Sequence, residues 1–173
     1  MNFYVIQVKA KTENNYLNLA KKTINQANIH FYWFRRELAQ RKNGKIRNVL
    51  SPIFPGYIFL ETEIITKDLY CGLRKLPGFI RFLKNNEEIL PLTPKDLALI
   101  KHFLLTGEII HKSLVTFKPQ DRIQILAGPL KGLEGFIVKV DKRKQRVKVR
   151  LELYDDSFLI DFGFEAIERV RGT

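Results

Sequence analysis

Basic side chains gather in two stretches of this chain, and their characteristic chemistry is the binding of phosphate groups. The chain carries 30 Lys and Arg against 18 Asp and Glu, a formal net charge of +12 at pH 7. Such an excess attracts polyanions, and the phosphates that it neutralises release their counterions. We therefore predict nucleic-acid contact at both stretches, with a merely solvated tip as the alternative for the first. The predicted contacts are Arg41, Lys42, Lys45 and Arg47 in the first stretch, and Lys131, Lys142, Arg143, Lys144, Arg146 and Lys148 in the second.

No pattern typical of an enzyme accompanies these cations. His30, His102 and His111 are dispersed along the chain, and no nucleophile and base stand in a recognisable motif. The glycine-rich loop 128–135 resembles a phosphate-binding loop, but no helix pattern follows it to supply the helix N-terminus that such loops use. We expect no catalytic residue, no metal site and no cofactor.

The cysteine content and the N-terminal sequence indicate the cellular compartment. The single cysteine, Cys71, excludes an internal disulfide, so a reducing, cytoplasmic setting is expected. The N-terminus lacks a basic segment before a long apolar stretch, and no run approaches the ~18 apolar residues of a membrane span. We expect a cytoplasmic monomer that does not enter a membrane.

The elements that position the second basic stretch are predicted to be β-strands. Ile123 and Ile125, and later residues 136–140, alternate with polar residues on either side of the glycine-rich loop. Residues 147–153 alternate in the same way, Asp155-Asp156 form a turn, and residues 158–162 make the next strand. About five short strands in some fifty residues are typical of an SH3-like barrel.

The first basic stretch lies in a region that mixes helices and strands. The pair Asn43-Gly44 is a strong hairpin signal, with the basic residues on both sides. Strands are predicted at 3–8, 31–34, 53–60 and 78–83, with a turn or bulge at Pro55-Gly56. Three helices are predicted. The first follows Thr12 and continues through Ala27, the second spans 67–76, and the third follows the N-cap Thr93. This order indicates an α+β sandwich with helices against a sheet.

Four segments together resemble the NusG family of transcription elongation factors. Residues 4–9 open the chain, residues 52–59 contain Phe-Pro-Gly-Tyr, residues 77–82 begin with Pro-Gly-Phe, and residues 121–140 match a KOW motif. The resemblance implies an N-terminal NGN α/β sandwich at 1–105, a linker at 106–118 and a C-terminal KOW domain, an SH3-like β-barrel, at 119–173. It also implies that the NGN domain binds RNA polymerase through its sheet. Carried onto this chain, the implied polymerase-binding residues are Tyr4, Phe54, Tyr57 and Phe59.

The basic KOW segment is similar to that of specialised paralogues such as the LoaP antiterminators, which implies RNA-hairpin binding and readthrough of terminators. The alternative is a housekeeping adaptor whose KOW domain binds a ribosomal or termination protein. In that case an exposed strand face would form the docking surface. Non-template DNA near Thr66 and Lys67 is a weaker alternative partner. The residues considered for the adaptor face are Phe136, Phe158, Ile160 and Phe162.

Overall fold

A computed structural model describes residues 1–167 of the chain as two compact units. We call residues 1–34 and 54–101 the sheet unit, and residues 35–53 with 102–167 the barrel unit. The β-hairpin is thus grouped with the C-terminal strands, although in sequence it interrupts the N-terminal part. The last residues of the predicted KOW domain, 168–173, lie outside the described residues.

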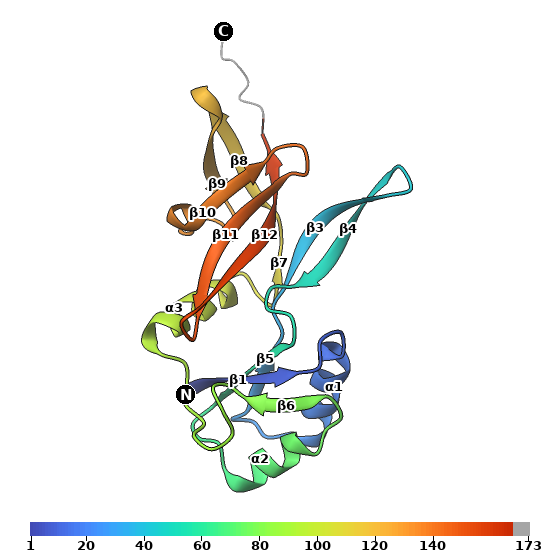
Figure 1. The fold of residues 1–173 in the computed structure, drawn as a ribbon, viewed down its shortest axis with the longest axis vertical. Helices are drawn as coiled ribbons and strands as arrows, with labels where there is room; N and C mark the ends of the chain where they lie inside the picture. The colour runs from blue at the N-terminus through green and yellow to red at the C-terminus, as the bar shows by residue number, and fades with distance from the viewer. Residues whose placement is uncertain (168–173) are drawn as a thin grey trace. The chain divides into compact units, whose positions relative to one another are not determined.

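The sheet unit is a four-stranded sheet with two helices packed on one face (Figure 1). The strand order is β2-β5-β1-β6, and β5 runs antiparallel to both β1 and β2. Tyr4, Ile58 and Leu60 project from the sheet into a core that they share with Tyr16 and Leu73 of the helices. The elements are β1 (Asn2–Val8), α1 (Glu13–Thr23), β2 (His30–Tyr32), β5 (Tyr57–Thr62), α2 (Lys67–Arg74) and β6 (Phe79–Phe82).

The helices begin where the sequence predicts, and the first two end earlier than predicted. Helix α1 starts directly after Thr12 but stops at Thr23, so Ala27 lies beyond it and is exposed, contrary to the prediction. Helix α3 (Pro94–Leu104) starts in the sheet unit, and its last residues belong to the barrel unit. The predicted N-cap of α3 is confirmed, because Thr93 Oγ1 donates to Asp96 Oδ2 at 2.9 Å and accepts from the Asp96 amide at 3.3 Å.

The predicted turn at Pro55-Gly56 is confirmed, and because it precedes β5 the strand begins at Tyr57 rather than at Ile53. Gly56 has φ +78°, a conformation that a glycine adopts without a steric penalty. Its amide donates to the buried Glu13 carboxylate at 2.8 Å, and its carbonyl accepts from the Val8 amide at 2.7 Å. These hydrogen bonds hold the backbone before Tyr57 in the turn. The strand pairs with β1 only from Tyr57 onward.

We expect Gly56→Ala to lower the free energy of unfolding by roughly 3 kcal/mol, because it combines left-handed strain with overpacking. A Cβ at Gly56 would lie 2.9 Å from the Val8 carbonyl oxygen, which is backbone and cannot rotate away. Gly44→Ala is the matched control, since Gly44 has φ +75° but no atom within 4 Å of the added Cβ. We expect the control to cost about 1 kcal/mol by urea unfolding. Equal losses for the two variants would contradict this account.

The barrel unit contains a five-stranded sheet in the order β10-β11-β12-β8-β9 (Figure 1). Strand β11 buries Val147, Val149 and Leu151 and turns the residues between them toward the other face, as the alternation predicts. The glycine-rich loop leads into the 3-10 turn η2 (Glu134–Phe136). Phe136 therefore precedes the strand in which it was predicted. The elements are β8 (Ser113–Lys118), the 3-10 turn η1 (Pro119–Asp121), β9 (Arg122–Ala127), β10 (Ile137–Asp141), β11 (Arg146–Leu153) and β12 (Asp156–Ala166).

The hairpin consists of β3 (Arg35–Lys42) and β4 (Lys45–Pro52), paired antiparallel throughout. Asn43 and Gly44 both have positive φ, 51° and 75°, as a two-residue type I′ turn requires, so the hairpin prediction is confirmed. On its other edge, β3 pairs in parallel with β7 (Ile109–Ile110). The segment predicted as a linker, 106–118, therefore contains β7 and all of β8.

Candidate nucleic-acid interface

The base of the hairpin is attached to the barrel by the half-buried Arg36. Arg36 Nε donates to the Asp161 carbonyl oxygen of β12 at 2.5 Å, and its Nη1 donates to the Pro52 carbonyl oxygen at the end of β4. Burial lowers the pKa of the Arg36 guanidinium, the Asp161 carboxylate raises it in part, and Arg146 lowers it. Arg36 thus joins both hairpin strands to the barrel sheet at one point.

Further contacts follow the hairpin strands along the barrel unit. Arg146 of β11 donates from Nη2 to the Ala39 carbonyl oxygen at 2.8 Å, and Lys112 Nζ donates to Asn48 Oδ1 at 2.9 Å. Gly163 of β12 leaves so little space that an added Cβ would lie 2.8 Å from the Glu37 carbonyl oxygen. The hairpin and the barrel strands are therefore in close backbone contact, and their relative position within the unit is fixed by packing.

Beyond this attachment, the hairpin and the β10–β11 turn enclose a groove of about 500 Å³, which we call the basic groove. One wall comes from the hairpin and the other from the turn and the start of β11. Five lining side chains are cations, and none of the described residues that line it is acidic. The lining residues are Ala39, Gln40, Arg41, Ile46, Lys142, Arg143, Lys144, Gln145 and Arg146.

A smaller depression of about 120 Å³ adjoins the basic groove on the face of β10, β11 and β12. The two share Lys144 and Arg146, so the basic surface continues from one to the other. Here Asp161 opposes the cations, since its carboxylate lies 3.2 Å from Lys148 Nζ and 3.9 Å from Arg146 Nη1. Asp161 therefore reduces the positive potential of this depression.

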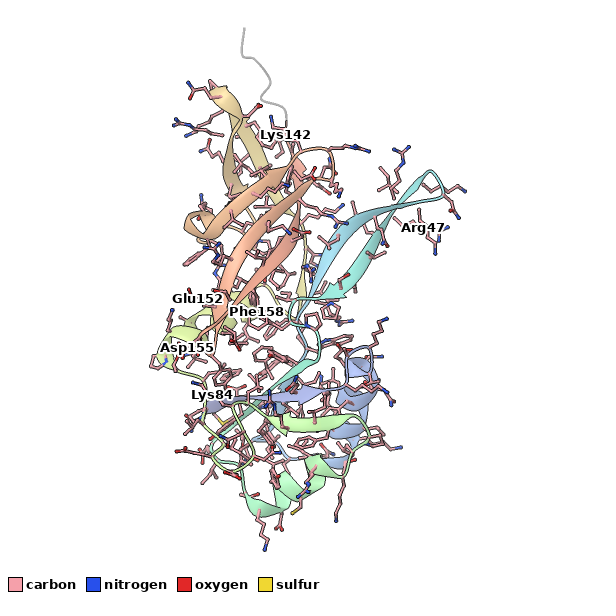
Figure 2. The ribbon with its side chains drawn as sticks, in the orientation of Figure 1. Arg47, Lys84, Lys142, Glu152, Asp155 and Phe158 are labelled. Atoms are coloured by element: carbon pink, nitrogen blue, oxygen red, sulfur yellow. The ribbon has the colours of Figure 1, made fainter. Side chains whose placement is uncertain are left out.

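The structure brings some of the predicted contacts together and separates others. Lys142 lies at the β10–β11 turn and Arg47 on β4 of the hairpin, as Figure 2 shows. Lys142 also forms an ion pair with Asp121 and lies 4.3 Å from the centre of the Phe117 ring. Lys131 donates to the Ile125 carbonyl oxygen at 3.3 Å and does not line the groove. The predicted contacts that line the groove are Arg41, Lys142, Arg143, Lys144 and Arg146. Lys148 lines the depression, and Lys42, Lys45 and Arg47 are exposed along the hairpin.

The sheet unit carries a second candidate surface, an aromatic face opposite α1 and α2. Strand alternation turns Tyr57 and Phe59 to this face, because Ile58 and Leu60 project into the helix-covered core. The rings of Phe54 and Tyr57 stack with centroids 6.4 Å apart, and those of Phe54 and Phe59 lie 5.9 Å apart. The aromatic face consists of Phe3, Tyr32, Phe34, Phe54, Tyr57 and Phe59, linked through successive ring contacts.

The four residues expected to contact polymerase are divided between the two faces of this sheet. Tyr4 pairs with Leu60 and lies in the helix-covered core, so it does not share a face with the other three. Phe54 and Phe59 are buried, with 2% and 1% of their surface exposed, whereas Tyr57 is half-buried. Tyr57 is therefore the most accessible ring of the four.

Of the residues considered for an adaptor face, two belong to the barrel core. Ile160 and Phe162 are buried, and Phe162 stacks on Phe103 of α3 with centroids 6.0 Å apart. Phe136 is 55% exposed and Val138 of the edge strand β10 is 45% exposed. The apolar surface accessible on this edge is thus Phe136 with Val138.

Two residues of this surface were not predicted from the sequence. Arg36 attaches the hairpin to the barrel sheet, and Asp161 reduces the positive potential of the depression. One available signal was that Arg36 shares a strand face with the buried Leu38, which is unusual for a solvated arginine. For Asp161, the charged position inside the apolar strand 158–162 was the corresponding signal.

Residues 1–167 offer no group of three His, Cys, Asp or Glu side chains that could hold a metal ion. Over the same residues, no helix is long and apolar enough to cross a membrane.

Comparisons with known proteins agree on one family. A family model described as transcription termination factor nusG matches residues 1–101. The transcription termination/antitermination protein NusG of Borreliella burgdorferi is 32% identical over 136 residues, 75% of this chain and 74% of that protein. The Bacillus subtilis protein of the same name is 24% identical over 177 residues, 98% of each chain. The solved structure of Thermotoga maritima NusG shares the fold, with a TM-score of 0.57, 17% identity and coverage of 94% of this chain and 93% of that chain.

Proposed function

The chain belongs to the NusG family of transcription termination/antitermination factors, and from this premise we propose that it binds RNA polymerase and promotes readthrough of terminators. Proteins of this family are transcription factors and not enzymes. In the proposal, the aromatic face of the sheet unit contacts polymerase while basic residues of the barrel unit contact an RNA hairpin. The partners are thus RNA polymerase and RNA, and the setting is the cytoplasm.

The basic groove supports RNA binding most directly. Five cations line one concave surface, and the described lining residues include no carboxylate. Asp121 and Asp161, which pair with Lys142 and Arg146, lie outside this lining, and Arg41, Arg143 and Lys144 add three further cations to it. Phosphate binding uses such convergent cations, and each contact contributes to a steep salt dependence. This surface supports a specialised, LoaP-like role over that of a general factor.

The observation that supports polymerase binding is the continuous row of rings on the sheet. Aromatic side chains supply large contact areas at low entropic cost, which makes them frequent anchors of protein interfaces. The half-buried Tyr57, beside the buried Phe54 and Phe59, has the arrangement of an anchor at the edge of a packed cluster. The proposed division of labour assigns polymerase binding to residues 1–105 outside the hairpin, and RNA binding to the KOW domain at 119–173 together with the hairpin. Residues 106–118, which contain β7 and β8, connect the two.

A housekeeping adaptor is the second candidate function, favoured by the exposed Phe136 and Val138 on the barrel's edge. An exposed edge strand with apolar side chains suits the addition of a partner protein such as a ribosomal or termination protein. The two functions differ in what the barrel unit binds. Non-template DNA remains a weaker proposal for the region of Thr66 and Lys67.

The direct test is assembly of a complex from purified components. We expect the full chain to bind core RNA polymerase, and the resulting complex to bind an RNA stem-loop more tightly than polymerase alone does. Gel-filtration and fluorescence anisotropy with a labelled stem-loop measure the two steps separately. Binding to polymerase with no gain in RNA affinity, together with capture of a purified ribosomal protein, would instead support the adaptor.

We expect Asp161→Asn to increase the affinity for an RNA stem-loop roughly threefold, because it removes the carboxylate that pairs with Lys148 and Arg146. The backbone carbonyl that accepts from Arg36 is retained in this variant, so the hairpin attachment is preserved. Asp68→Asn on α2 is the matched control, since Asp68 is exposed and lies in the sheet unit. Anisotropy at low salt measures both, and an unchanged or weakened affinity for Asp161→Asn contradicts the prediction.

A further inference from the structure

We propose that the β3–β4 hairpin and the β10–β11 turn bind one RNA duplex together in the basic groove, contacting its phosphates and 2′-hydroxyl groups. This inference rests on the RNA binding proposed above. It adds that the hairpin and the β10–β11 turn, which lie far apart in the sequence, form a single site, and it states which form of RNA that site binds.

The two walls of the groove are held in a fixed position relative to each other. Arg36 bonds β12 and the end of β4, and Arg146 bonds β3 from within the groove's own lining. Gly163 permits close backbone approach at the same junction. Arg146 both lines the groove and attaches the hairpin. A ligand that contacts Arg146 on the β11 wall therefore contacts a residue that holds the hairpin wall in position.

The charge of the groove favours a polyanionic ligand. Arg41 faces the turn that carries Lys142, Arg143 and Lys144 across the groove. Asp121 pairs with Lys142, but the like charges of Arg41, Arg143 and Lys144 around one space are unfavourable without further counter-charges, and a polyanion supplies several at once. A single acidic side chain of a partner would neutralise only one of them, whereas a nucleic-acid backbone presents a regular series of charges.

The side chains that line the groove also indicate the form of the ligand. No aromatic ring is among the described residues that line the groove, so stacked bases have no platform there. The Lys142 ammonium group lies over the Phe117 ring, 4.3 Å from its centre, and so covers that ring. Gln40 and Gln145 supply neutral amides that donate and accept hydrogen bonds, which fits the 2′-hydroxyl groups of paired RNA. These features favour the backbone of an RNA stem over splayed single-stranded bases or DNA.

The experiment measures binding of the full chain to an RNA stem-loop, the unpaired RNA strand and a DNA duplex of the same sequence. The variants are Arg41→Gln on the hairpin, Lys144→Gln on the turn, and the two combined. Arg41 and Lys144 are both exposed in the structure, and thermal unfolding checks that each of the three variants folds. Lys22→Gln, an exposed lysine at the end of α1, is the control.

We expect one stem-loop per chain, each single variant to weaken this one binding event about tenfold at low salt, and each to lower the salt slope by about one. The double variant is expected to lower the salt slope by about two. The control is expected to change neither the affinity nor the salt slope. Two stem-loops per chain, or one event that is sensitive to only one of the two variants, overturns the single site while leaving RNA binding intact. Equal affinity for the DNA duplex or the unpaired strand overturns the assignment to paired RNA. No binding of any RNA overturns the proposed function as well.

Discussion

Replacing Tyr57 with alanine is expected to weaken binding of the chain to core RNA polymerase about 30-fold, the loss of an aromatic anchor worth about 2 kcal/mol. Tyr57 is the half-buried member of the aromatic face, and its ring stacks on Phe54. Its removal deletes contact area and the ring that stacks on Phe54. Titration of labelled chain with polymerase measures the change.

The control for this prediction is Tyr4→Phe. Tyr4 lies in the helix-covered core, and phenylalanine keeps its packing volume, so polymerase affinity should stay within about twofold of the parent value. Phe59→Ala is unsuitable because a ring with 1% exposure costs ~3 to 5 kcal/mol of stability when it is truncated. A strong effect of Tyr4→Phe, or none of Tyr57→Ala, would show that polymerase binds elsewhere.

Replacing Arg36 with methionine is expected to lower the free energy of unfolding by about 2 to 4 kcal/mol. The guanidinium donates to the carbonyl oxygens of Pro52 and Asp161, and methionine leaves both acceptors without this partner. Because the same bonds attach the hairpin to the barrel sheet, we also expect faster hydrogen exchange of the β3 and β4 amides. Urea unfolding and amide exchange measure the two effects.

Arg47→Met provides the comparison for this loss. Arg47 lies on the same hairpin but is exposed, so the identical change should cost no more than about 0.5 kcal/mol. A similar loss for Arg36 and Arg47 would mean that Arg36 stabilises the chain only through its general charge. An unchanged exchange rate in the hairpin would show that other contacts, such as Lys112 with Asn48, suffice to hold it.

Local signals in the sequence predicted the elements of this fold well. Asn43-Gly44 specified the hairpin turn because both positions need positive φ, and Thr93 with Asp96 specified the start of α3 because their side chains bond each other. The early end of α1 was missed, since the apolar spacing continues through Ile24 to Ala27 although the helix does not. Periodicity alone therefore locates a helix better than it locates the helix end.

The sequence indicated which residues to consider for the candidate sites, but not how the fold arranges them. The alternation of β5 separated Tyr57 and Phe59 from Ile58 and Leu60, but the faces were settled only by pairing with β1, which puts Tyr4 beside Leu60. The basic residues stood out by charge. Their convergence depends on Arg36 reaching Asp161, a contact across 125 positions of the chain that local patterns do not encode.

The central claim is most directly tested by terminator readthrough in a purified transcription system, on templates with and without a sequence encoding an upstream RNA hairpin. We expect the chain to raise readthrough strongly when the hairpin is present. We expect Tyr57→Ala to abolish this gain, and Arg41→Gln with Lys144→Gln to abolish its dependence on the hairpin. Equal readthrough on both templates, or readthrough that these variants leave unchanged, would contradict the central claim.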